Sequence, residues 1–288
     1  MTGGALPFIV RRNLALYFRD RMAVFYSMLG ALVVLALYAF FIRDAYVTGL
    51  EAPGAANATD LWMIGSLMAI VPVTTSLGAL GAFVSDREHK RANDFAVSPV
   101  SPLAITGGYL LSTMLIATAM SLGVLALSQA FMLAVGGTTM GGIQFAKVLG
   151  VLAISVLSST SILFLVVTFL RKESAFGGIS TAVGVFSGFV VGAYIPLGDM
   201  PGGVSSAFSV LPMSSSASLF REILAADAAA SMYAGAPPSE LIDHRAYVGF
   251  DLYVGDFMLE PWMCAAVILA SAVAAFLLAV LNLRRGLA

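Results

Sequence analysis

Long uncharged apolar runs restrict this chain more than any other feature of its sequence. Six of them can be read directly, at 22–42, 61–84, 103–135, 148–170, 174–195 and 261–283. A bilayer core about 30 Å thick needs roughly 20 apolar residues per helix, so each run is a candidate span. The chain is 59% hydrophobic and 11% charged, whereas roughly 25% charge is usual in soluble domains. The sequence therefore predicts an all-α integral membrane protein with six transmembrane helices.

Lysine and arginine gather on alternate sides of these runs. Eleven of the fifteen lie in the two terminal segments and in the connectors at 85–102 and 171–173. The other side has Arg43, Lys147, Arg221 and Arg245, together with eleven of the sixteen acidic residues. Because positively charged loops stay in the cytoplasm during insertion, we expect both termini to be cytoplasmic and the protein to lie in the plasma membrane.

The N-terminal segment, residues 1–21, is expected to form a helix in the membrane interface. A helix here places Val10, Leu14, Tyr17 and Phe18 on one face and Arg12, Asn13, Arg19 and Asp20 on the other. Ile9 and Leu16 fall on the polar side and interrupt this pattern. A positively charged anchor without a mechanical role explains the same residues.

The densest charge lies between the second and third runs, in SDREHKRANDFAVSPVSP, residues 85–102, which we call the charged segment. Six charges fall in the nine positions from Asp86 to Asp94. Ser85 and Glu88 fit an S-x-x-E capping box, which predicts that a new polar helix begins at Ser85. The prolines of SPVSP then end it. A solvated loop whose charges only fix the topology is the other interpretation.

The interiors of the six runs contain no Asp, Glu, Lys, Arg or His. Ion-coupled carriers normally need such groups at depth, so this absence argues against a secondary antiporter. The polar groups are hydroxyls and an amide, and several aromatic rings lie in the fifth run. Candidate pathway residues are Thr74, Thr75, Ser121, Gln129, Ser158, Phe186 and Phe189. Packing between helices or contact with lipid accounts for the same side chains.

The region between the fifth and sixth runs, residues 196–260, divides into two parts. Residues 196–220 are apolar but interrupted by Pro201 and Pro212, which predicts a re-entrant helical pair in the outer half of the membrane. Residues 221–260 are acidic and polar and predict a small external cap. The cap has no calcium-loop pattern, so no metal site is expected. His89 and His244 are expected to be solvated and Cys264 to be packed in an apolar run.

Two stretches resemble the ABC-2 type transporter permeases. The charged segment resembles the cytoplasmic coupling helix of that family, and DMPGGVSSAFSVLPMSSSASLFREI, residues 199–223, resembles its region after the fifth span. The likeness covers nearly the whole chain, as a single transmembrane domain over residues 1–288. It implies that the ATPase-coupling residues are Asp86, Arg87, Glu88, Lys90, Arg91, Asp94 and Phe95. It also implies that Pro201, Pro212 and Arg221 mark the re-entrant segment.

The resemblance implies one permease subunit of an ATP-driven exporter, working with a second permease subunit, identical or different, and with cytoplasmic ABC ATPase subunits. No G-x-x-x-x-G-K-[ST] loop occurs in the sequence, so ATP and magnesium are expected on the partner ATPase, and this chain is expected to be neither an enzyme nor a cofactor protein.

The uncharged interior of the runs favours an amphipathic or hydrophobic cargo, such as a drug, a peptide or a lipid-like molecule. A lipid-linked glycan is the alternative within the family. A non-transporting scaffold or an ion-coupled carrier is the alternative outside it. The fifteen basic residues are scattered along the chain, so no nucleic-acid partner is expected.

Overall fold

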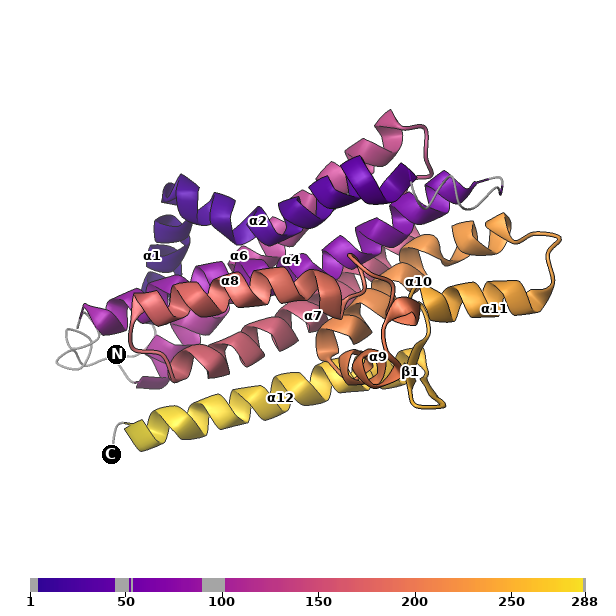
Figure 1. Ribbon diagram of the computed structural model, residues 1–288. Helices are drawn as coiled ribbons and strands as arrows, with labels where there is room; N and C mark the ends of the chain where they lie inside the picture. The colour runs from indigo at the N-terminus through magenta and orange to yellow at the C-terminus, as the bar shows by residue number, and fades with distance from the viewer. Residues whose placement is uncertain (1–4, 45–51, 53, 90–101, 287–288) are drawn as a thin grey trace.

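The computed structural model describes residues 5–44, 52, 54–89 and 102–286, and its long helices run side by side in an elongated bundle (Figure 1). The elements, in chain order, are α1 (Ala5–Arg19), α2 (Arg21–Leu37), the π-helix η1 (Tyr38–Ile42), α4 (Ala55–Glu88), α6 (Pro102–Ala134), α7 (Gly142–Thr168), α8 (Glu173–Val190), the 3₁₀ turn η2 (Leu197–Asp199), α9 (Gly202–Ser209), α10 (Pro212–Met232), α11 (Pro238–Tyr247), β1 (Leu252–Val254), β2 (Phe257–Leu259) and α12 (Pro261–Gly286).

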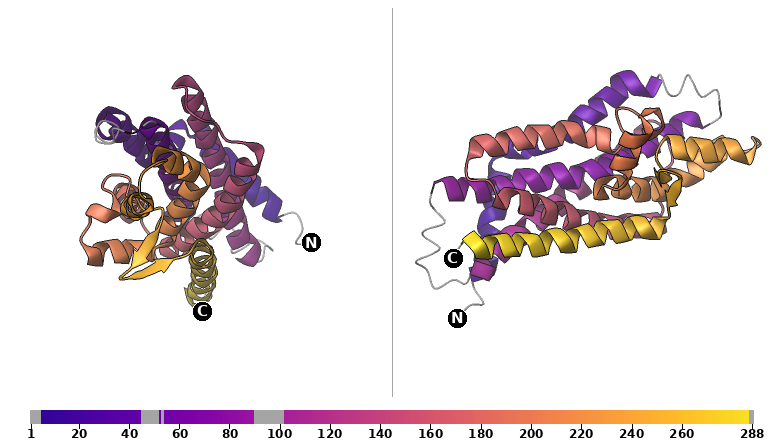
Figure 2. Two further views of the ribbon diagram at one scale, coloured as in Figure 1. Left: turned by 90° about the vertical axis from the view of Figure 1, so that its right-hand side faces the viewer. Right: turned by 60° about the horizontal axis from the view of Figure 1, so that its bottom comes forward.

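The bundle has two distinct ends. The beginning of α1 and the last turns of α4 and α12 lie at one end, which we call the terminal end (Figures 1 and 2). α11 and the β1–β2 hairpin lie at the opposite end, which we call the hairpin end.

α4 is the central helix. It packs against α2, α6, α7, α8 and α10, and residues 58–72 on it are all buried. Near its C-terminus Phe83 packs edge-on against Tyr109 of α6, with ring centroids 5.2 Å apart, and lies 5.3 Å from Phe164 of α7. A helix that is apolar all round is buried by its neighbours, and α4 follows this rule.

Four described helices are long and apolar enough to cross a membrane: α4, residues 104–134 of α6, α7, and residues 261–283 of α12. The first expected span forms α2, whose 17 residues lead directly into η1, and the fifth forms α8, with 18 residues. At 1.5 Å per residue each of these two helices is only about 25–27 Å long, slightly less than the bilayer core. The described helices therefore fit a multi-pass membrane protein.

α1 forms as expected but buries a different face. Ile9, Val10, Asn13 and Tyr17 are buried, whereas Phe18 is exposed. The expected apolar face is therefore wrong at Asn13 and Phe18. α1 packs mainly against α6, where Gly108 lets the helices approach so closely that a Cβ would lie 2.5 Å from Cγ2 of Ile9.

The charged segment does not begin a new helix at Ser85. α4 continues through Ser85 to Glu88, so Ser85 lies inside a helix and cannot cap one. The capping-box prediction is wrong because Asp86 is buried, 3% exposed, and packing extends the central helix past the S-x-x-E pattern. Residues 90–101, with Lys90, Arg91, Asp94 and Phe95, lie outside the described residues.

The region before α12 is broken at both expected prolines. Pro201 precedes α9, and Pro212 occupies the first turn of α10, where its missing N–H costs nothing. α10 then continues to Met232, well into the part expected to be an external cap, and packs along α4. The break between two helices is as predicted. However, α10 extends well past residue 220, where the predicted helical pair ends.

The rest of the expected cap is folded, and it is not entirely helical. β1 and β2 pair antiparallel through the two-residue turn Gly255-Asp256, with Gly255 at φ +61°. A Gly-Asp pair between apolar residues is a hairpin signal that the sequence interpretation missed. His244 on α11 is half-buried, which lowers its pKa, and its ring lies 5.1 Å from that of Tyr233, so the expectation of a solvated histidine is wrong.

The α2–α4 crossing depends on one glycine. A Cβ built on Gly78 would lie only 2.4 Å from Cβ of Ser27, so any larger residue forces the two helices apart. Gly123 of α6 provides a contrast, because a Cβ there meets nothing within 4 Å.

We therefore predict that Gly78→Ala lowers the free energy of unfolding by about 1–3 kcal/mol, the usual cost of overpacking. Gly123→Ala should be neutral or slightly stabilising, because alanine favours a helix by about 0.5–1 kcal/mol over glycine. Thermal unfolding of both purified variants in detergent measures the difference. Equal melting temperatures would contradict the close crossing of α2 and α4.

Candidate functional site

A cavity of about 910 Å³ opens between α1, α2, α4 and α8. Arg19, Asp20, Ser85 and Asp86 line it at the terminal end of the bundle. Its walls further along are mainly apolar or small, formed by Leu29, Val33, Leu77, Gly78, Gly81, Gly184 and Val185, with the rings of Tyr26, Phe176 and Tyr194. Small-molecule pockets usually measure about 300–1,000 Å³ and are mostly apolar with a few polar groups, so the cavity has the size and character of a ligand site.

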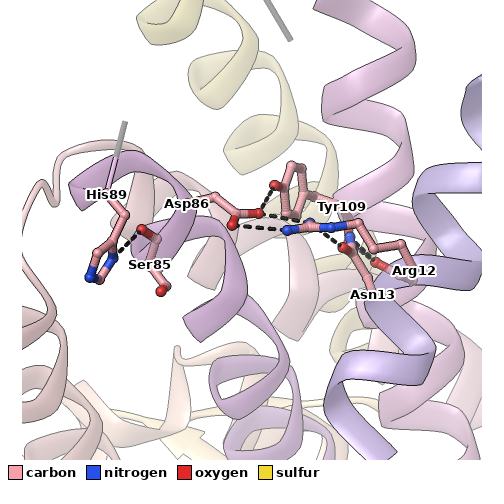
Figure 3. A network of polar contacts seen from close by, with 7 residues as sticks. Arg12, Asn13, Ser85, Asp86, His89 and Tyr109 are labelled. Carbon is pink, nitrogen blue, oxygen red and sulfur yellow. Dashed lines mark hydrogen bonds and ion pairs between the residues drawn. The ribbon is translucent and has the colours of Figure 1, made fainter. Parts of the chain in front are cut away.

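A buried carboxylate lies at the polar end of this cavity. Asp86 of α4 accepts two hydrogen bonds from the guanidinium of Arg12 of α1, at 2.8 and 3.0 Å, and one from the Tyr109 hydroxyl of α6, at 2.5 Å. Figure 3 shows the carboxylate held between these two side chains. Asn13, next to Arg12, donates to Ser112 of α6 at 3.1 Å. We call Arg12, Asp86 and Tyr109 the Asp86 cluster.

The Asp86 cluster joins three helices through one charge. The Asp86 side chain is 4% exposed and that of Arg12 is 25% exposed, so the arginine reaches water and the carboxylate hardly does. The hydrogen bond and the negative charge of Asp86 raise the pKa of Arg12, so the arginine stays protonated. Planar, bidentate pairing of this kind fixes geometry as well as charge.

A second cluster with the same chemistry lies near the other end of α4. Asp60 is 2% exposed and accepts hydrogen bonds from Nε and Nη2 of Arg43, at 2.9 and 3.1 Å, and from the Tyr38 hydroxyl of η1, at 2.5 Å. Tyr38, Asp60 and Arg43 form the Asp60 cluster, which fastens the C-terminal end of the first expected span to α4. Each end of the central helix therefore carries a buried carboxylate held by an arginine and a tyrosine.

The next two residues of the charged segment contact other helices of the bundle. Arg87 donates to the backbone carbonyl of Thr168, at the C-terminus of α7, at 2.8 Å. Glu88 is exposed and accepts a hydrogen bond from the backbone N–H of Glu173, the first residue of α8, at 2.5 Å. A cation at a helix C-terminus and an anion at a helix N-terminus are both favoured by the helix dipole. The end of α4 is thus tied to α7 and α8.

Arg221, expected only to mark the re-entrant segment, is fully buried at 0% exposure. Its guanidinium donates to the Ser66 hydroxyl, to the Gly249 carbonyl at 3.0 Å and to the Val191 carbonyl at the end of α8 at 2.5 Å. It also lies 5.1 Å from the ring centroid of Trp62. Arg221 therefore connects α10 to α4, to the end of α8 and to the loop before β1.

One of the seven expected pathway residues, Thr74, lines the cavity. Four others are engaged within the bundle, since Thr75 donates to the Val71 carbonyl, Ser158 bonds Ser271, Gln129 accepts from the Met140 N–H and Phe189 packs against Tyr194. Ser121 is buried, and Phe186 is 62% exposed on the surface of α8. The expected set does not converge on one site.

The sequence interpretation missed most of the residues that do converge. Tyr17, Asp20 and Tyr26 line the cavity, and Arg12, Arg43 and Asp60 complete the two clusters. Phe176 and Tyr194, which also line the cavity, belong to the aromatic rings noted in the fifth run. A charge at each end of an apolar run is a usable signal, because a charge that packing buries needs a partner on a neighbouring helix. Asp60 and Asp86 flank the second run in this way.

We predict that Arg221→Met destabilises the protein strongly, because it leaves buried carbonyls without donors at about 1–3 kcal/mol each. Lys147→Met is the matched control, since Lys147 is exposed on α7. The measurement is the melting temperature of each variant in the same detergent. If the two variants have the same melting temperature, Arg221 does not hold α10 and the loop before β1 against the bundle.

Comparison with known proteins gives one family. A family model described as an ABC-2 family transporter protein matches residues 49–283, which covers the elements from α4 onward except the last three residues of α12. No curated protein matches the chain.

Proposed function

This chain belongs to the ABC-2 family of transporter proteins, and from that premise we propose that it is the membrane-spanning permease subunit of an ATP-driven exporter. In this proposal it moves an amphipathic or hydrophobic compound outward across the plasma membrane. A separate ABC ATPase binds ATP and magnesium and supplies the energy. The observation that carries the proposal is the match over residues 49–283 combined with a ligand-sized cavity beside the central helix.

The proposed topology has six spans, with both termini and the charged segment in the cytoplasm. α2 with η1 and α8 serve as the first and fifth spans beside the four longer helices. The terminal end of the bundle is then cytoplasmic and the hairpin end is external. The placement of basic residues along the sequence supports this orientation.

The cavity supports the choice of cargo. Its charged residues, Arg19, Asp20 and Asp86, lie at the proposed cytoplasmic end, and its other walls are mostly apolar or small with a few hydroxyls, which suits a molecule with a polar head and an apolar body. Exposed apolar side chains border the cavity on α2 and α8, among them Tyr26, Leu29, Val33 and Val185. A second permease subunit covering this side would enclose the pathway. A lipid-linked glycan is disfavoured because it presents many hydroxyls to largely apolar walls.

Purification of the tagged chain from native membranes tests the proposal directly. An ABC ATPase should co-purify, and the pair in liposomes should move a fluorescent amphiphile only when ATP is hydrolysed. The matched control is the same pair with the P-loop lysine of the ATPase replaced by alanine. Absence of an ABC ATPase, or movement that continues in the control, would contradict the proposed function.

The charged segment is proposed to dock on that ATPase, and Glu88 is an exposed residue of its described part at the end of α4. We predict that Glu88→Lys with Asp94→Lys leaves insertion intact but reduces co-purified ATPase, because reversed charges repel the partner surface they normally match. The reversal Glu240→Lys with Asp243→Lys on α11, at the proposed external end, is the control. Full retention of the ATPase by the first variant would show that these charges only fix topology.

Cysteine labelling tests the topology. In a Cys264→Ala background, which removes the single native cysteine, Glu240→Cys should react in sealed cells with a membrane-impermeant thiol reagent. Asn93→Cys and Leu287→Cys should react only after permeabilisation. Labelling of Asn93→Cys in sealed cells would overturn the six-span arrangement.

A further inference from the structure

Asp86 is too deeply buried to meet an ATPase surface, although its place in the charged segment suggests such a contact. Its side chain is 4% exposed, and described partners from α1 and α6 hold both carboxylate oxygens. An ion pair buried in this way gains little stability, because the cost of removing both charges from water offsets their attraction. The need to hold α1 and α4 in a fixed relative position explains this ion pair better than a contribution to the free energy of unfolding does.

The Asp86 cluster lies where two moving parts of a transporter would meet. Asp86 is two residues before the end of α4, and the charged segment continues from that end. Arg12 lies on α1, the helix that supplies Leu16, Tyr17 and Arg19 to the wall of the cavity. The ion pair therefore joins the end of the central helix to one side of the cavity mouth.

α1 has few other ties to α4. It packs mainly on α6, through the close approach of Ile9 to Gly108 and the hydrogen bond from Asn13 to Ser112, and touches α4 far less. The bidentate bond from Arg12 adds a direct tie between α1 and the end of α4. A displacement of that end therefore acts on α1 through this bond.

We propose that Arg12 and Asp86 are positioning residues that fasten α1 to the end of α4, so that movement of α4 driven by the ATPase shifts α1 and changes the opening of the cavity. The proposal rests on the proposed function, since it needs an ATPase that moves α4. The Tyr109 hydroxyl keeps the carboxylate turned towards Arg12. Asp86 thus acts through α1 and not through contact with the ATPase.

The test uses the complete permease–ATPase complex in liposomes and three readouts: co-purified ATPase, melting temperature, and molecules transported per ATP hydrolysed. Asp86→Asn removes the charge but keeps the shape and the capacity for hydrogen bonds. It should keep the ATPase and melt near the wild type. It should transport about five- to tenfold less per ATP, the lower part of the roughly 5–150-fold range typical of coupling between sites.

Arg12→Gln, alone and combined with Asp86→Asn, separates coupling from folding. Arg12→Gln should melt lower than Asp86→Asn, because it leaves a buried carboxylate without its cation, whereas Arg12 in the other variant reaches water. The double variant should recover much of that melting temperature yet stay uncoupled, because the bidentate bond is still missing. Arg11→Gln, which removes an exposed charge from the same turn of α1, is the control and should behave as the wild type.

The outcomes are distinct. Normal transport per ATP in Asp86→Asn, or in the double variant, would make the pair merely structural and overturn the proposal. Loss of the ATPase from Asp86→Asn would assign Asp86 to docking and overturn it as well. Wild-type protein that shows no ATP-driven transport would refute the proposed function, a failure separate from that of the positioning role.

Discussion

A buried carboxylate needs a cation and hydrogen-bond donors, and α4 carries such a carboxylate near each end. Asp60 takes its donors from Arg43 and Tyr38, and Asp86 takes its donors from Arg12 and Tyr109. The apolar residues between them are buried by five neighbouring helices. Close packing along its length and ion pairs near its ends make α4 a firm element to which α1 and the first expected span are attached. The cavity opens beside this element, and its other walls are α1, α2 and α8.

The region between α8 and α12, which includes α10, α11 and the hairpin, is held by a different kind of interaction. Arg221 binds a hydroxyl and two backbone carbonyls in the fully buried junction of α10, α4 and the end of α8. Gly65 of α4 allows this junction, since a Cβ there would lie 3.0 Å from Cγ of Arg221. Nearer the surface Arg245 of α11 pairs with Glu222 and Asp251, both at 2.8 Å, and joins α10 to the hairpin. The pKa of Arg245 is raised by its hydrogen bonds to these two carboxylates. The region expected to be a small external cap is therefore tied to the bundle by specific contacts.

The sequence predicted the features that depend on local physics. Apolar runs marked the long helices, and Pro201 and Pro212 marked the breaks before and after α9, because proline acts on its own backbone. Contacts between helices that are far apart in sequence determine the other features. The S-x-x-E pattern at Ser85 is a sound local signal, yet burial of Asp86 between α1 and α6 extends α4 past it. The cavity could not be predicted, because it combines residues from helices that are far apart in sequence. The hydroxyls chosen as pathway residues mostly satisfy their own helix or a neighbour, as buried hydroxyls usually do.

In the proposed mechanism, α1 and the end of α4 move as one unit when the ATPase acts. Distances between spin labels in the liposome complex, with the buried Cys264 replaced by alanine, measure this directly. Labels at Arg11 and His89 report on α1 against α4, and labels at Arg11 and Ser174 report on α1 against α8 across the cavity; all three positions are exposed. We expect trapping with ATP to shift the second distance and leave the first unchanged. An equal shift in both distances, or a shift in the first alone, would show that α1 and the end of α4 do not move as one unit.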